Sequence, residues 1–179
     1  MASVTKIDIG IKGISPLLMH KFPMEPVEAI EKKTAQEQAE IAAYRDPNGN
    51  LYLPGICLQR ALVNGATYCK GKGRSSLQKQ AAACLLVSPE YIQLGTNTFA
   101  IDSRPVVNPS TKGRIIRHRA RIDEWKVSFT LEYDPVLLSE NQVRDIIDNA
   151  GSRVGVLDFR PERKGSFGRF QVVLWSKAS

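Results

Sequence analysis

The chain has 179 residues, of which 42% are hydrophobic and 24% are charged, a composition typical of one globular domain with a full hydrophobic core. No apolar run approaches the roughly 20 residues that cross a bilayer, and the first residues lack the continuous apolar segment of a signal peptide. We therefore expect a cytoplasmic protein with no membrane partner. The formal net charge of +7 raises the expectation of a polyanionic partner.

The first predicted strand covers residues 5–13, where Ile7, Ile9 and Ile11 alternate with polar residues. A segment with three prolines interrupts this pattern. Residues 27–44 then predict a peripheral helix with a thin apolar face and more glutamates than basic residues, and the turn DPNGN ends it.

A second helix is predicted over residues 55–69, entered from a short strand through Pro54 and Gly55 and buried on one face. It runs out into the basic loop KGKGR at residues 70–74. Beyond that loop we expect a further helix at residues 76–85 and a strand at 91–94.

Residues 113–133 predict a β-hairpin with strands at 113–122 and 124–134. One face of its first strand carries an arginine row, and the opposite face is apolar. The arginine row is Arg117, Arg119 and Arg121, and the apolar residues are Ile116, Ala120 and Ile122.

The last helix is predicted over residues 139–150, with Ser139 and Gln142 forming a capping box and Gly151 as a left-handed C-terminal cap. A final strand follows at residues 168–175, with Phe170, Val172 and Leu174 on one face.

Taken in order, the main elements spell βαββαβ, which predicts an α+β domain with a ferredoxin-like core, the arrangement also found in RRM modules. On this interpretation residues 1–179 form a single domain with insertions at about 15–50 and 71–108. Such a fold leaves one sheet face free of helices, and many RNA-binding modules use that face. Here we expect it to carry the arginine row.

The stretch GVLDFRPERKGSFGRF, residues 155–170, joins the last helix to the last strand and holds three glycines and four basic residues. Arginine pairs bidentately with phosphate oxygens, and glycines let backbone N–H groups approach an anion. Phe159 and Phe167 either stack on unpaired bases or anchor the ends of the loop in the core.

Motifs for other chemistry are missing from the sequence. GKGRSS lacks the third glycine of a dinucleotide fingerprint, and GATYCKGKG has no Ser or Thr after its lysine, as a P-loop requires. Cys57, Cys69 and Cys84 form no CxxC pair, and only His20 and His118 could join them. We therefore expect neither a metal site nor a cofactor.

Two motifs resemble the RAMP superfamily, the ferredoxin-like RNA-binding proteins of CRISPR effector complexes. LPGICLQRALVNGA, residues 53–66, is similar to their helix start, and VGVLDFRPERKGSFGRFQV, residues 154–172, is similar to their C-terminal glycine-rich loop. The match is strongest to the backbone subunits, which polymerise along a guide RNA. The resemblance implies RNA binding within a multi-subunit ribonucleoprotein of antiviral defence, and a phage or mobile-element relative that coats a single strand fits the same motifs.

The sequence thus predicts a non-catalytic protein that binds single-stranded RNA, or else DNA, and forms a homo-oligomer or filament along it. The predicted contacts are Arg60, Lys70, Lys72, Arg74, Arg117, Arg119, Arg121, Arg160, Arg163, Lys164 and Arg169. One alternative is a metal-independent endoribonuclease that uses His20 as general acid or base. The other is a phage virion or assembly protein whose basic surface neutralises packaged nucleic acid.

Overall fold

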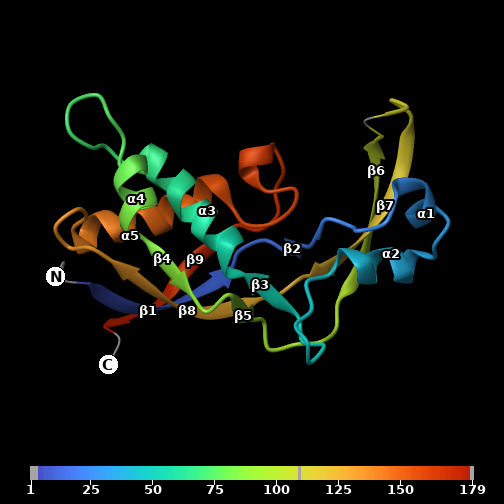
Figure 1. Ribbon diagram of the computed structural model, residues 1–179, viewed down its shortest axis with the longest axis horizontal. Helices are drawn as coiled ribbons and strands as arrows, with labels where there is room; N and C mark the ends of the chain where they lie inside the picture. The colour runs from blue at the N-terminus through green and yellow to red at the C-terminus, as the bar shows by residue number, and fades with distance from the viewer. Residues whose placement is uncertain (1–3, 109, 178–179) are drawn as a thin grey trace.

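The computed structural model describes residues 4–108 and 110–177. Figure 1 shows an antiparallel sheet with helices on one face and, beyond its far end, a long arm. The arm consists of the strands β6 (Ala100–Val107) and β7 (Arg114–Ile122), and the helix α2 (Ala35–Ala42) packs against both. The described residues are therefore mixed α and β, with a four-stranded main sheet, a three-stranded sheet that contains the arm and a separate two-stranded sheet.

The main sheet has the strand order β4-β8-β1-β9, and every neighbouring pair is antiparallel. Its strands are β1 (Thr5–Gly13), β4 (Leu86–Ser88), β8 (Lys126–Tyr133) and β9 (Phe170–Lys177). Ile7 lies opposite Leu131, and Ile9 lies opposite Phe129. These apolar side chains are buried because they face the helices, as the alternation in residues 5–13 predicts.

Three helices cover that face: α3 (Gly55–Gly65), α4 (Gln78–Cys84) and α5 (Glu140–Asn149). The capping box of α5 is confirmed, because the Gln142 backbone N donates to Ser139 Oγ over 3.3 Å and the Ser139 backbone N donates to Gln142 Oε1 over 2.9 Å. Leu58 and Leu62 of α3 and Val143 of α5 are fully buried. Helix α3 ends four residues earlier than predicted and continues as a short 3₁₀ turn, η1 (Ala66–Tyr68).

The α+β fold class is confirmed, and β1, α3, β4, β8, α5 and β9 supply the βαββαβ order. The second strand of this order is not the one that the sequence predicts. The edge position beside β8 belongs to β4, whereas residues 113–122 form β7 (Arg114–Ile122), a strand of the arm. A strand of three residues, such as β4, carries too short an alternation to be recognised in sequence.

The predicted hairpin at residues 113–133 is wrong. β7 pairs with β6 (Ala100–Val107) along its whole length and with β2 (Leu17–Leu18) near its end. After β7 the chain runs on into β8 instead of reversing, because Trp125 is buried and its backbone O accepts from the Gly13 backbone N over 2.9 Å. β8 therefore pairs with β1 from its first residue, Lys126.

The predicted helix at residues 27–44 consists of two short helices, α1 (Val27–Glu31) and α2 (Ala35–Ala42). They break at Thr34, whose hydroxyl caps α2 in a capping box with Glu37. The short strand β3 (Tyr52–Pro54) pairs with β5 (Tyr91–Gln93), close to where the sequence places both.

Two details at the end of the chain differ from the prediction. Gly151 is not a left-handed cap: the helix continues as a π turn, η2 (Ala150–Val154), and the left-handed glycine is Gly155, with φ 73°. The register of β9 shifts by one residue at a bulge opposite Gly10 and Ile11. Phe170 and Val172 therefore face the core as predicted, but Leu174 is half exposed on the other side.

The helix-free face of the main sheet does not carry the arginine row. It presents polar pairs of β1 and β8, among them Lys6 with Glu132 and Asp8 with Thr130. The division into a core and insertions at about 15–50 and 71–108 stays a prediction, although β4 lies within the second segment. None of the helices in residues 4–108 and 110–177 has the length and apolar character of a membrane span.

Candidate nucleic-acid interface

The glycine loop, residues 155–169, joins η2 to β9 and contains the 3₁₀ turn η3 (Pro161–Arg163). Backbone hydrogen bonds hold it against β2 and the residues just before that strand. The Gly168 N donates to Pro16 O over 2.8 Å, and the Asp158 N donates to Leu18 O over 3.0 Å. The loop is therefore fixed to the body of the protein at several points, and it is not a free tail.

The backbone of the glycine loop is unusually strained. Left-handed φ values occur at Gly155 (73°), Leu157 (60°), Phe159 (51°), Lys164 (63°) and Gly168 (69°). A Cβ atom at Gly168 would lie 2.0 Å from the Val156 O, so only glycine fits there. Each non-glycine residue in this region costs roughly 1 to 2 kcal/mol, and such strain clusters at functional sites.

The glycine loop and α3 face each other across a cavity of about 270 Å³. Its lining includes Arg60 and Asn64 from α3 and Arg160, Glu162 and Arg163 from the loop. We call this cavity the arginine cleft. The structure thus brings together three of the predicted contact residues, Arg60, Arg160 and Arg163, from segments a hundred positions apart.

The three arginines of the cleft differ in their partners. The guanidinium of Arg160 donates to Glu162 Oε2 from Nε over 3.0 Å and from Nη2 over 2.8 Å, and its Nη1 donates to Leu157 O over 2.8 Å. Arg60 and Arg163 are exposed, and neither forms an ion pair with any described residue. The cleft therefore offers two free guanidinium groups and a third that is already fixed in direction.

Cys57 also lines the arginine cleft, beside Arg60. Burial raises the pKa of the Cys57 thiol, and the opposing effect of Arg60 and Arg160 is smaller. A thiol with a raised pKa is protonated at neutral pH and is a poor nucleophile. The cleft is thus suited to binding an anion rather than to thiol chemistry.

The other predicted basic residues lie away from the cleft lining. Lys70, Lys72 and Arg74 are exposed on the loop between η1 and α4, at the outer end of the helical layer (Figure 1). Lys164 is exposed immediately after η3. Arg169 is exposed at the end of the glycine loop, immediately before β9, and its backbone N donates to Ser15 Oγ over 3.0 Å. Their contact with nucleic acid stays a prediction.

The arginine row of β7 is paired with carboxylates of the protein itself. Arg117 Nη2 lies 3.9 Å from Glu31 Oε1, and Arg119 Nη1 lies 3.0 Å from Asp158 Oδ2. Arg121 Nε donates to Asp123 Oδ1 over 2.7 Å. The side chains of Arg117 and Arg119 are only 16% and 11% exposed, so the row is largely covered and is not an open basic stripe.

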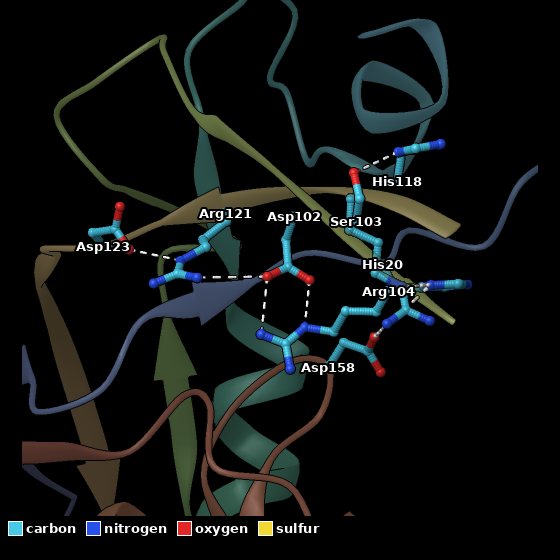
Figure 2. A network of polar contacts seen from close by, with 9 residues as sticks. His20, Asp102, Ser103, Arg104, His118, Arg121, Asp123 and Asp158 are labelled. Carbon is cyan, nitrogen blue, oxygen red and sulfur yellow. Dashed lines mark hydrogen bonds and ion pairs between the residues drawn. The ribbon is translucent and has the colours of Figure 1, made fainter. Parts of the chain in front are cut away.

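Asp102 of β6 is the centre of a second set of contacts, which Figure 2 shows from close by. Its side chain is 6% exposed and accepts two hydrogen bonds from Arg104, at 2.5 and 3.0 Å, while Arg121 Nη1 lies 3.5 Å away. The guanidinium of Arg104 lies 5.4 Å from the ring centre of Phe159 and 4.7 Å from that of Phe167. Cation–π contact of this kind attaches the arm to the glycine loop.

These contacts explain the two phenylalanines of the glycine loop. Phe167 is buried, whereas Phe159 is 39% exposed, and their ring centres are 5.9 Å apart. Of the two roles that the sequence leaves open, the structure gives Phe167 the anchoring one. Phe159 combines an arginine contact on the arm with an exposed edge.

His20 lies between the arm and the glycine loop. Its Nδ1 accepts a hydrogen bond from Arg119 Nε over 2.9 Å and lies 3.9 Å from Asp158 Oδ2. Burial lowers the pKa of His20 below its usual range, Arg119 and Arg117 lower it further, and Asp158 partly opposes them. The imidazole is therefore neutral at pH 7, with its proton on Nε2.

The cavity beside His20 has largely apolar walls, and the two arginines in its lining, Arg117 and Arg119, are paired with Glu31 and Asp158. The cavity has a volume of about 390 Å³ and lies between the arm and the helices α1 and α2, and its lining also includes Val27, Ile30 and Ile41. His118 is hydrogen-bonded to Ser103, with Nδ1 and Oγ 2.7 Å apart. Within residues 4–108 and 110–177, no group of three His, Cys, Asp or Glu side chains could hold a metal ion.

The sequence did not point to three further side chains of the cleft and the arm: Asn64, which lines the cleft, and Asp102 and Arg104, which join the arm to the glycine loop. Asn64 lies one turn of α3 beyond Arg60, so its position beside that arginine follows from helical spacing once the face is known. Asp102 and Arg104 share one face of β6, but nothing local indicates which strand they meet.

No protein-family model and no curated protein sequence matches this chain. Among solved structures, the fold is similar to a chain in the cryo-EM structure of the Type III-B Cmr-beta bound to cognate target RNA, with a TM-score of 0.60 and 12% sequence identity. The similarity covers 98% of this chain and 62% of the other, so this chain spans less than two thirds of its structural neighbour. This likeness agrees with the α+β fold that the order of the elements predicts.

Proposed function

We propose that this protein binds single-stranded RNA without cleaving it, and that the arginine cleft is the main contact with the phosphate backbone. The observation that carries the proposal is the convergence of Arg60, Arg160 and Arg163 on one cavity beside a strained, fixed glycine loop. Two of these guanidinium groups have no carboxylate partner among the described residues, so they are available to phosphate without breaking an existing ion pair.

The structural neighbour supports RNA as the ligand, because that chain belongs to an assembly bound to RNA. The same chemistry also binds single-stranded DNA, since phosphate and arginine are common to both. Competition between RNA and DNA of the same sequence separates the two ligands. Our proposal expects RNA to compete better, through contacts to the 2′-hydroxyl.

We further propose that several copies assemble side by side on one strand, within a ribonucleoprotein of the CRISPR type or a phage counterpart. Charge supports this arrangement. The glutamates of α1 and α2 lie at one end of the molecule, and the basic loop of Lys70, Lys72 and Arg74 lies at the other (Figure 1). Opposite charges at opposite ends favour a head-to-tail contact that repeats into a filament.

The test of assembly is the mass of the complex formed on RNA strands of increasing length. Our proposal expects the number of bound copies to rise in proportion to strand length. Reversing a charge at the acidic end with Glu28→Lys, an exposed residue of α1 outside the predicted RNA contacts, should leave single-copy binding to a short strand intact and weaken the growth on long strands. A complex that stays at one copy on every length contradicts assembly while leaving RNA binding untouched.

A His20-dependent endoribonuclease is the competing function, because a neutral imidazole is the form that a general base requires. Incubation of end-labelled RNA with the native protein in a metal chelator tests it. Our proposal expects intact RNA from both the native protein and His20→Ala. Cleavage by the native protein that His20→Ala abolishes would establish the enzyme instead.

A further inference from the structure

Glu162 is the acidic side chain in the lining of the arginine cleft, and both of its carboxylate oxygens are in use. Oε2 accepts two hydrogen bonds from the guanidinium of Arg160, over 3.0 and 2.8 Å. Oε1 accepts one from Asn64 Nδ2, over 2.7 Å. The carboxylate thus bridges the glycine loop and α3 across the mouth of the cavity.

This arrangement matches what a phosphate group requires of the same residues. An arginine offers a planar fork of N–H groups to the oxygens of either a carboxylate or a phosphate, and an amide adds a further donor. Arg60 and Arg163 line the same cavity, and neither has a carboxylate partner within residues 4–108 and 110–177. Glu162 therefore occupies the position in which a backbone phosphate would meet Arg160 and Asn64 together.

We propose that Glu162 is a built-in competitor of the ligand: its carboxylate fills a phosphate subsite of the arginine cleft and turns away when the polyanion binds. This inference rests on the proposed function of the cleft. Glu162 is 32% exposed, so its side chain has open solvent into which it can turn. Competition by Glu162 weakens the complex, but it makes binding selective for ligands that present several phosphates.

The selectivity follows from the order of events. A single small anion meets Arg60 and Arg163 but gains too little from them to displace Glu162 from Arg160. A strand whose neighbouring phosphates bind Arg60 and Arg163 holds the next phosphate close to Arg160 at a high effective concentration, so the displacement becomes favourable. Glu162 therefore sets a threshold in the number of phosphates.

The test is the dissociation constant of a labelled single-stranded RNA, measured by fluorescence anisotropy at one fixed salt concentration. Removing the competing charge with Glu162→Gln should tighten binding about fivefold, the effect of one unit charge near the ligand in a well-solvated site. Glu124→Gln, which makes the same change of net charge on an exposed residue outside the cleft, should alter binding by less than about twofold because salt screens it.

A double-mutant cycle locates the effect. In a protein that carries Arg160→Ala, the gain from Glu162→Gln should vanish, because Glu162 no longer has the arginine from which it excludes phosphate. Binding by Glu162→Gln that equals or falls below native binding overturns the inference and makes Glu162 a residue that positions Arg160. A gain that persists beside Arg160→Ala also overturns it.

Two controls keep the outcomes separate. Glu162→Ala provides a second variant should Glu162→Gln fail to fold, and it should show the same tightening. If neither the native protein nor the glutamine variant binds the RNA with a salt-dependent affinity, the proposed function of the cleft fails. If the native protein binds and Glu162→Gln does not bind more tightly, only the competitor inference fails.

Discussion

Arg119 of the arm lies 3.0 Å from Asp158 of the glycine loop, measured between Nη1 and Oδ2, and this ion pair ties the arm to the loop. The Arg119 side chain is 11% exposed, so removal of its partner leaves a largely buried charge unpaired. We expect Asp158→Asn to lower the free energy of unfolding by about 1 to 3 kcal/mol, measured by urea denaturation.

A matched control is available on the same strand. Arg117 pairs with Glu31 over 3.9 Å, and the Glu31 side chain is 35% exposed. Glu31→Gln should cost less than about 1 kcal/mol, because its pair with Arg117 is long, 3.9 Å against 3.0 Å for Arg119 and Asp158, and an ion pair at that separation contributes little. Equal effects of Asp158→Asn and Glu31→Gln would contradict the role given to Asp158.

Arg104 should matter more than its partial exposure suggests. It makes two hydrogen bonds to the buried Asp102 and lies over both rings of the glycine loop. We expect Arg104→Ala to lower the free energy of unfolding by about 2 to 3 kcal/mol, because the buried Asp102 loses two hydrogen bonds and keeps only the more distant Arg121, and because the cation–π contact is lost. Arg104→Lys keeps the charge but not the fork, and it should recover only part of that loss. Full recovery by lysine would show that the fork is not needed.

His20 predicts a specific dependence of stability on pH. The pKa of His20 is lowered from 6.5 by burial first and by Arg119 and Arg117 after it, with Asp158 opposing them. The unfolded chain therefore takes up a proton more readily than the folded protein between pH 6.5 and the lowered folded pKa. Stability should be complete above about pH 6.5 and should fall as the pH drops through that window.

The measurement is the free energy of unfolding from pH 8 to pH 5 for the native protein and for His20→Ala. Other groups titrate in both proteins, so the difference between the two free energies of unfolding reports on His20. The native protein should lose its advantage over His20→Ala as the medium is acidified. A difference that stays constant with pH would show that His20 titrates alike in the folded and unfolded chains.

Gly168 tests whether the shape of the glycine loop matters for binding. Its φ is 69°, and a Cβ atom there would lie only 2.0 Å from the Val156 O, which leaves no room for alanine. Gly168→Ala should therefore distort the loop and weaken RNA binding at least tenfold, or about 1.4 kcal/mol. Gly49 also has a left-handed φ, of 85°, but nothing lies within 4 Å of a Cβ there. Gly49→Ala should leave RNA binding unchanged. Equal losses of RNA affinity in Gly168→Ala and Gly49→Ala would mean that the shape of the glycine loop is not the cause.

The sequence predicts most of the main sheet and its helices because those elements carry long, regular patterns. The alternation of Ile7, Ile9 and Ile11 and the capping box of Ser139 are local features, and both are confirmed. β4 escapes recognition because three residues show no period. The pairing of β6 with β7 is not predicted, because polar and apolar residues alternate in these strands as in any hairpin. The reason that the next strand pairs with β1 is the buried Trp125, which no local pattern indicates.

The candidate site is less predictable than the fold, because its pairs join distant parts of the chain. The arginine row of β7 looks like an open basic stripe in sequence, but Glu31 and Asp158 are 86 and 39 positions away from the arginines that they neutralise. Arg60 is predicted on a helix and Arg160 and Arg163 on the glycine loop, and the packing of α3 against that loop brings them together. Side-chain type predicts the ligand class here, whereas tertiary contacts decide which side chains remain free.

The central claim is that the arginine cleft binds the phosphate backbone, and the salt dependence of RNA affinity tests it most directly. The dissociation constant of a labelled single strand is measured between about 50 and 200 mM salt for the native protein, for Arg60→Ala with Arg163→Ala, and for a control that carries Lys12→Ala with Lys126→Ala on the helix-free sheet face. The cleft variant should bind more weakly, and the slope of log affinity against log salt should become shallower by about 1.4, or about 0.7 for each of two lost phosphate contacts on a single strand. The control should keep the native slope. An unchanged slope in the cleft variant, or an equal change in the control, would contradict the account.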